Sequence, residues 1–212
     1  MCRDNMEMPF FDGAAGRVHH RRWPVENPQL GLIFLHGRGQ HSGHYHRFAR
    51  AMGASGIEVW ALDQVGHGLT EGDLAVPAPV DELRADALHL TGLAESARAR
   101  LAFAVMGHSM GAVVAISAVA DDPDRFGAAV LCGTPKSVKT RGLPLPAVPT
   151  LMIHGADDRV APVDAVHEWV GEDRSVDLRV FENSGHNLLH EPGYATVTEV
   201  VAQFLLATMR NR

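Results

Sequence analysis

The sequence predicts an α/β fold in which a mostly parallel sheet carries helices on both faces. Three observations indicate this: apolar runs of strand length, segments with helical apolar spacing between them, and polar clusters directly after the runs. Strands that are apolar along their whole length are typical of parallel sheets buried on both faces. The 212 residues suffice for one domain with a substantial core. We therefore expect residues 1–212 to form a single domain.

The expected strands are short and bounded by turn residues. An edge strand or hairpin is predicted at Gly16–Trp23, where the fold begins. The remaining strands are expected at Leu30–Leu35, Ile57–Leu62, Ala102–Met106, Phe126–Cys132, Thr150–His154 and Val176–Phe181. In open parallel sheets, sites gather beyond the carboxyl ends of the strands, so the residues after each run are the candidates for function.

Helices are expected between these strands because apolar residues recur there at intervals of three and four. One helix is predicted at Met110–Ala120. Three further apolar faces consist of Tyr45, Phe48, Ala49 and Met52, of Leu83, Ala87, Leu90, Ala94 and Ala97, and of Tyr194, Val197, Val201, Phe204 and Leu205. Each face is expected to pack on the sheet.

Composition excludes several classes of protein. The net charge of −6 argues against nucleic-acid binding, and no apolar run approaches the roughly 20 residues that cross a bilayer. The start, MCRDNMEMPFF, does not have the pattern of a secretory signal. Two cysteines, Cys2 and Cys132, are too few for a disulfide framework. These features favour a cytoplasmic protein with a small-molecule substrate and without integral membrane contact.

The stretch FAVMGHSMGAVVA places a serine in a sharp turn between a strand and a helix. Ser109 lies two residues after Gly107 and two before Gly111, which gives G-x-S-x-G. A serine in such a turn has strained backbone angles, and only glycines leave room for the crossing chains. The alternative is a serine that merely caps the following helix. The pattern favours a nucleophile.

A serine nucleophile needs a histidine base and a carboxylate that orients it. His186 follows the strand that ends at Phe181, and Asp157 and Asp158 follow the strand that ends at His154. The chain order serine, acid, histidine is the order of the G-x-S-x-G hydrolases. The residues alone leave both aspartates as candidates. One oxyanion-hole N–H is expected from Met110, which follows the nucleophile.

The motifs HGRGQHSGHY, DQVGHG, GHSMGA, GADDRVAP and SGHNLLHEP together resemble the α/β-hydrolases of the monoglyceride lipase and lysophospholipase-like (serine aminopeptidase-type) group. The resemblance covers nearly the whole chain and implies an α/β-hydrolase fold with Asp158 as the acid. It places the second oxyanion N–H at Arg38, in a substrate-binding segment with His36 and Gly37. The family commonly has a small residue at this position. We expect the Arg38 guanidinium to pair with a protein carboxylate, with a substrate carboxylate as the alternative.

The clearest departure from the family lies after Cys132, where its members carry a cap domain. Here only residues 133–149 join two neighbouring strands, and a parallel crossover needs about a dozen residues. The segment includes LPLPAVP, in which the prolines prevent a helix. We therefore expect a lidless site that favours short acyl chains, or a homo-oligomer that covers the opening.

The predicted function is a serine carboxylesterase that works through an acyl-enzyme and needs no cofactor or metal. Thioesterase, lactonase and acyltransferase activities use the same triad and remain alternatives. More remote is a dinucleotide-binding oxidoreductase built on GRGQHSG and Asp63. Equally remote are a non-catalytic binding protein and a metal site at His41, His44 and His46.

Overall fold

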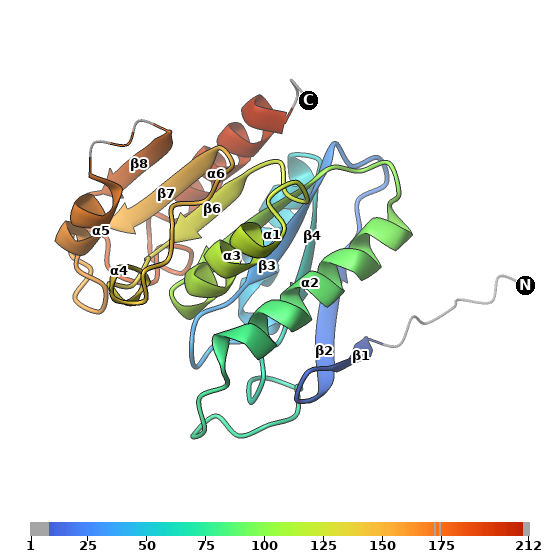
Figure 1. Ribbon diagram of the computed structural model, residues 1–212. Coiled ribbons are helices and arrows are strands. Elements are labelled where there is room, and N and C mark those ends of the chain that lie inside the picture. Colours follow the sequence, from blue (N-terminus) through green and yellow to red (C-terminus); the bar gives the residue numbers. More distant parts are fainter. Residues whose placement is uncertain (1–8, 172, 174, 210–212) are drawn as a thin grey trace, which may run out of the picture.

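The computed structural model describes residues 9–171, 173 and 175–209, which contain one eight-stranded sheet (Figure 1). Its strands are β1 (Phe10–Gly13), β2 (Gly16–Trp23), β3 (Leu30–Leu35), β4 (Ile57–Leu62), β5 (Phe103–His108), β6 (Ala129–Cys132), β7 (Thr150–Gly155) and β8 (Val176–Phe181). Their spatial order is β1-β2-β4-β3-β5-β6-β7-β8. Only the β1–β2 and β2–β4 pairs are antiparallel. The mostly parallel sheet expected from the sequence is confirmed.

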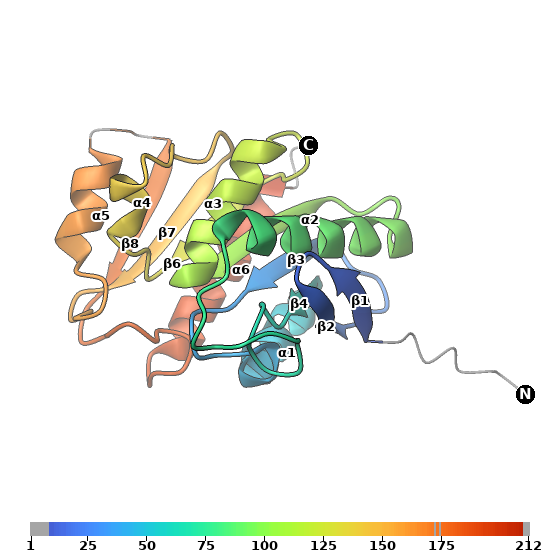
Figure 2. The ribbon, with the colours of Figure 1, turned by 60° about the horizontal axis from the view of Figure 1, so that its bottom comes forward.

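Helices cover both faces of this sheet (Figure 2). They are α1 (His46–Ala54), α2 (Val80–Ala97), α3 (Met110–Asp121), α4 (Ser137–Thr140), α5 (Val163–Val170) and α6 (Tyr194–Met209), and a 3-10 turn, η1 (Ser42–Tyr45), precedes α1. Helices α2, α3 and α5 pack on one face, and α1 and α6 pack on the other. The α/β class is therefore also confirmed.

Alternation along the strands divides the core into two layers. On β3, Ile33 and Leu35 point to the layer under α2 and α3, whereas Leu32 and Phe34 point to the layer under α1 and α6. Every residue of β3 to β7 is buried, which explains why their sequences are apolar without interruption. Strand β8 is at the sheet edge and is partly exposed.

Two elements differ from the sequence expectation. Strand β6 begins at Ala129 although the apolar run begins at Phe126; Phe126 and Ala128 are buried without belonging to the strand, so the run reports burial. Helix α5 was not expected, because its apolar face is narrow and Val166 is its one fully buried residue. Apolar spacing is a weak signal for so short a helix.

The connection between β6 and β7 is short. Residues 133–149 contain α4, a helix of four residues, and no other helix or strand. Within the part of the chain that the structure describes, no helix is both long and apolar enough to cross a bilayer. Cys2 and the start of the N-terminal stretch lie outside the described residues.

A charged cluster is buried beneath the β2–β4 edge. The fully buried Glu58 carboxylate accepts hydrogen bonds from the guanidinium groups of Arg22 (3.1 Å) and Arg98 (2.7 Å). Trp60 Nε1 (3.0 Å) and the Val25 N–H (3.0 Å) also donate to it. Burial alone would raise the pKa of Glu58, but the hydrogen bonds from Arg98, Val25 and Arg22 lower the pKa to about 2.

We expect Glu58→Gln to lower the free energy of unfolding by about 3 kcal/mol near neutral pH, because it leaves two arginines uncompensated. The folded-state pKa lies below the ordinary value of 4.5. The stabilisation is therefore full above that value and is lost as the pH falls toward 2. Urea unfolding at several pH values measures the difference between the variant and the unmodified chain.

The matched control is Glu26→Gln, at an exposed position, which should change stability by no more than about 0.5 kcal/mol. A difference for Glu58→Gln that stays constant as the solution is acidified would contradict the assignment of this stabilisation to the Glu58 charge.

Candidate active site

Ser109 occupies a strained turn between β5 and α3. Its φ of 52° and ψ of −113° lie in a backbone region that residues with a Cβ rarely adopt. A Cβ on Gly107 would overlap the Gly111 carbonyl, and a Cβ on Gly111 would overlap the Leu35 carbonyl of β3. In the described chain the Ser109 side chain makes no cap hydrogen bond to α3, so the helix-cap interpretation does not account for it.

His186 and Asp158 are in direct contact. His186 Nδ1 donates to Asp158 Oδ2 across 2.7 Å. Asp158 Oδ1 accepts the N–H groups of Val160 (2.9 Å) and Ala161 (2.8 Å), and its carboxylate is fully buried. Asp157, the other candidate, is exposed. Of the two aspartates, the structure therefore places Asp158 against the histidine.

The histidine loop and the serine turn meet at His108, the residue before Ser109. His108 Nε2 donates to the His186 carbonyl oxygen (2.9 Å), and the two imidazole rings lie 4.9 Å apart between centroids. Among the hydrogen bonds of the described residues, none joins Ser109 Oγ to His186. Bonds of this kind are often long without substrate and tighten when it binds.

Two backbone N–H groups near the serine are free. The N–H groups of Arg38 and Met110 have no hydrogen-bond acceptor among the described residues, whereas the N–H of Gly37 donates to Gln40 Oε1 (3.0 Å). Met110 begins α3, where the helix dipole favours negative charge. These two donors suit an oxygen that becomes negative during a reaction.

Comparison with known proteins places this geometry in a family. Residues 26–148 match the family described as serine aminopeptidase, S33. The chain belongs to that family. It is 34% identical over 125 residues to a monoacylglycerol lipase of Mycolicibacterium smegmatis, covering 58% of this chain and 45% of that protein. It is 33% identical over 127 residues to the monoglyceride lipase of Homo sapiens, covering 59% and 42%. The chain thus spans less than half the length of these curated relatives.

Solved structures extend the likeness of fold to nearly the whole chain. Est1E from Butyrivibrio proteoclasticus, solved with ferulic acid, superposes with a TM-score of 0.83 at 17% identity and covers 95% of this chain and 99% of its own. A thermostable carboxyl esterase from Bacillus coagulans, in complex with glycerol, has a TM-score of 0.80 at 18% identity, covering 94% and 97%. These similarities show the α/β-hydrolase fold.

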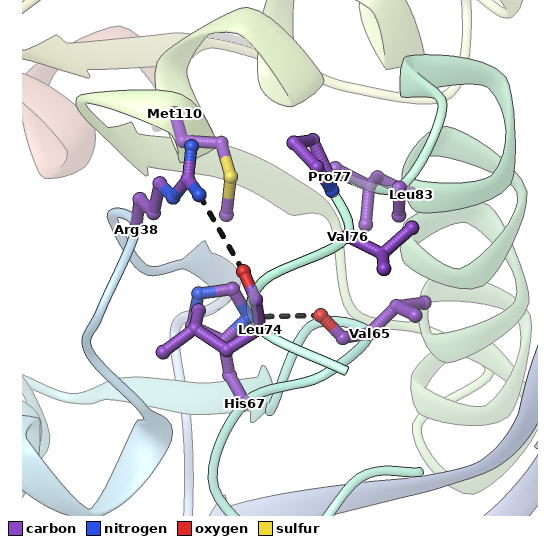
Figure 3. Close-up of a pocket in the computed structure, with 9 residues that line it drawn as sticks. Arg38, Val65, His67, Leu74, Val76, Pro77, Leu83 and Met110 are labelled. Atoms are coloured by element: carbon purple, nitrogen blue, oxygen red, sulfur yellow. Dashed lines mark hydrogen bonds between the residues drawn. The ribbon is translucent and has the colours of Figure 1, made fainter. Parts of the chain in front are cut away.

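In this S33 chain a small cavity lies beside the two free N–H groups (Figure 3). Its volume is about 40 Å³, a few times the roughly 10–15 Å³ that one water needs. The loop after β4 supplies most of its wall, which sequence reasoning did not foresee. The lining residues are Arg38, Val65, His67, Leu74, Val76, Pro77, Ala78, Leu83 and Met110.

The Arg38 side chain differs from the expectation. We expected an ion pair with a protein carboxylate, but Nη2 of Arg38 donates to the backbone carbonyl of Leu74 across 3.4 Å (Figure 3). In residues 9–171, 173 and 175–209 no carboxylate comes within ion-pair distance of it. The guanidinium lines the cavity and is exposed.

His36 and Gly37 also differ from their expected contact with substrate. The His36 ring is fully buried; its Nδ1 donates to the Gly37 carbonyl (2.8 Å), and its Nε2 accepts the Gln64 N–H (2.9 Å). Burial lowers the pKa of His36 to about 4, so the ring is neutral. Both residues therefore hold the backbone before Arg38 and do not reach the substrate side.

Gln40 and Glu191 are polar residues of the site that sequence reasoning did not single out. Gln40 Oε1 accepts the Gly37 N–H, and its Nε2 donates to Asn187 Oδ1 (3.1 Å). Glu191 accepts the N–H groups on both sides of His186, from Gly185 (2.7 Å) and Asn187 (3.0 Å). Both residues lie inside the recognised motifs, but the motifs do not tell where their side chains point.

Asp63 is occupied within the protein. Its carboxylate accepts the N–H groups of Ser42 (2.7 Å) and Leu69 (3.0 Å) and contacts His19 Nδ1 (2.9 Å). With 1% of its surface exposed, it has no access to a ribose hydroxyl. The observation disfavours the dinucleotide alternative and shows that Asp63 ties the loops after β3 and β4 to β2.

The three histidines considered as metal ligands do not converge. The His41 and His44 rings lie 3.9 Å apart between centroids, but His46 Nδ1 accepts a hydrogen bond from Trp23 Nε1 (3.0 Å). Among the described residues, no group of three histidine, cysteine or acidic side chains is arranged to hold a metal ion.

Cys132 contributes to the site through its backbone. Its carbonyl accepts the Ser109 N–H (2.8 Å), which fixes the serine turn to the end of β6. The thiol is fully buried, and burial raises its pKa far above the usual value. It is therefore not a candidate nucleophile.

Proposed function

We propose that this chain is a serine hydrolase that cleaves carboxylic esters through an acyl-enzyme on Ser109. The 2.7 Å bond from His186 to Asp158, at the edge where Ser109 is held in its uncapped turn, carries the proposal. Such a bond fixes the imidazole tautomer whose Nε2 accepts the serine proton. Relatives named as monoacylglycerol and monoglyceride lipases support an ester substrate.

In the first half of the reaction, Ser109 Oγ attacks the ester carbonyl carbon while His186 Nε2 takes the hydroxyl proton. The carbonyl oxygen becomes an oxyanion that accepts hydrogen bonds from the N–H groups of Arg38 and Met110. When the intermediate collapses, the ester C–O bond breaks and His186 returns the proton to the departing alcohol. Water then repeats these steps on the acyl-enzyme and releases the acid.

Other acyl compounds pass through the same intermediate. Thioesters and lactones differ only in the leaving group, and an alcohol in place of water makes the chain an acyltransferase. A panel of p-nitrophenyl esters, acyl thioesters and lactones, assayed for hydrolysis and for transfer to added alcohols, ranks these activities.

Ser109→Ala should abolish turnover, by about a million-fold, since the nucleophile is lost. A fluorophosphonate probe should label the unmodified chain at Ser109 and leave the variant unlabelled. Ser96→Ala, on exposed α2 surface, is the control and should keep full activity. Retention of a few per cent of the esterase activity by folded Ser109→Ala would show that another group is the nucleophile.

Asp158→Asn should lower turnover by about 10⁴-fold, because the amide no longer holds the reactive tautomer of His186. Asp157→Asn is the matched control at the neighbouring, exposed position and should change turnover little. Steady-state kinetics with a p-nitrophenyl ester compares the two variants. Equal losses, or a larger loss for Asp157→Asn, would refute the role assigned to Asp158.

Short acyl esters should be the preferred substrates. The connection 133–149 provides no cap, and the cavity of about 40 Å³ offers little apolar wall for a long chain. We expect kcat/KM to peak at roughly two to six acyl carbons, because further methylenes find no surface on which to be buried. The p-nitrophenyl ester series measures this, beside sedimentation mass, since a homo-oligomer that covers the opening would add wall. A monomer that prefers dodecanoyl or longer esters would contradict the open site.

A further inference from the structure

The cavity beside the free N–H groups contains a cation without a protein counter-ion. Figure 3 shows the Arg38 guanidinium next to Met110, at the wall of the cavity. Its one hydrogen bond among the described residues is the 3.4 Å contact with the Leu74 carbonyl, which is long and uncharged at the acceptor. Most of its donors are therefore left for a ligand, in a group that presents five N–H bonds.

The nearest acidic residue along the cavity loop does not compete for this cation. Asp73 precedes Leu74, but its Oδ1 accepts the Ala75 N–H (2.8 Å) within the loop itself. The residues that line the cavity include no aspartate or glutamate. Arg38 thus supplies the one permanent charge of the lining, on a protein whose net charge is −6.

The rest of the wall suits a short hydrocarbon. Val65, Leu74, Val76, Leu83 and Met110 are apolar, and Leu74 and Val76 remain 45% and 67% exposed. A hydrocarbon segment that enters from the serine side would cover these side chains. A group at its far end would reach the solvent-facing guanidinium.

We infer that Arg38 makes this cavity selective for short acyl groups that end in a carboxylate, as in half-esters of small dicarboxylic acids. The inference rests on the proposed function and adds the class of acyl group. A carboxylate accepts two parallel N–H bonds from a guanidinium, which neither a methyl end nor a neutral polar end can match. Hydrolysis of such a half-ester releases the dicarboxylic acid and the alcohol.

The test compares two esters with acyl groups of equal length, 4-nitrophenyl hydrogen glutarate and 4-nitrophenyl pentanoate. The readout is the ratio of their kcat/KM values in the unmodified chain, Arg38→Met, Arg38→Lys and Arg50→Met. Arg38→Met keeps the backbone N–H and the stem of the side chain and removes the charge. Arg50→Met removes an exposed arginine on α1, away from the cavity lining, and controls for net charge.

We expect the unmodified chain and Arg50→Met to favour the glutarate by about tenfold, as charge-assisted hydrogen bonds allow. Arg38→Met should lose this preference and Arg38→Lys should keep part of it. About 0.5 M NaCl should weaken the preference, because an exposed charge is screened.

A ratio that is the same in the unmodified chain and Arg38→Met, with both esters hydrolysed, would overturn this inference and leave the proposed function standing. Absence of turnover of both esters, together with absence of fluorophosphonate labelling of Ser109, would overturn the proposed function and this inference with it.

Discussion

The close packing of three backbone segments around Ser109 is the constraint on which the candidate site depends. Strand β5, the start of α3 and the end of β3 approach so closely that a Cβ on Gly107 or Gly111 overlaps a carbonyl group. This contact forces the serine to a φ of 52° and turns its side chain away from the helix that it precedes. The same packing frees the Met110 N–H. A strained residue of this kind persists only where the surrounding structure determines it.

The loops that complete the site are held by hydrogen bonds that arise outside the three proposed catalytic side chains. Glu191 binds the backbone on both sides of His186, and His108 binds the His186 carbonyl. Gln40 joins the segment before Arg38 to Asn187, beside that histidine. A side chain held in this way loses little conformational freedom when a substrate arrives, which lowers the cost of reaching the reactive geometry.

The strands and most helices were predictable because burial on both faces leaves an uninterrupted apolar pattern. Strands β3, β4 and β8 have the bounds expected from the sequence. The contact between Asp158 and His186 followed from family resemblance, since the residues alone did not separate two adjacent aspartates. The cavity was not predictable: its wall comes from Leu74 and Val76, whose loop has no periodic pattern. Nor was the Arg38 contact, because whether a surface arginine meets a carboxylate depends on tertiary positions that sequence spacing does not encode.

The buried thiol of Cys132 has a consequence for the chemical environment that the site tolerates. Oxidants and alkylating reagents attack the thiolate, and burial keeps this sulfur protonated although its own backbone carbonyl holds the serine turn. The proposed chemistry uses oxygen and nitrogen groups alone. Peroxide or a shift in the glutathione potential therefore has no reactive sulfur at Cys132 through which to switch the site off, and its performance is independent of the redox state of that residue.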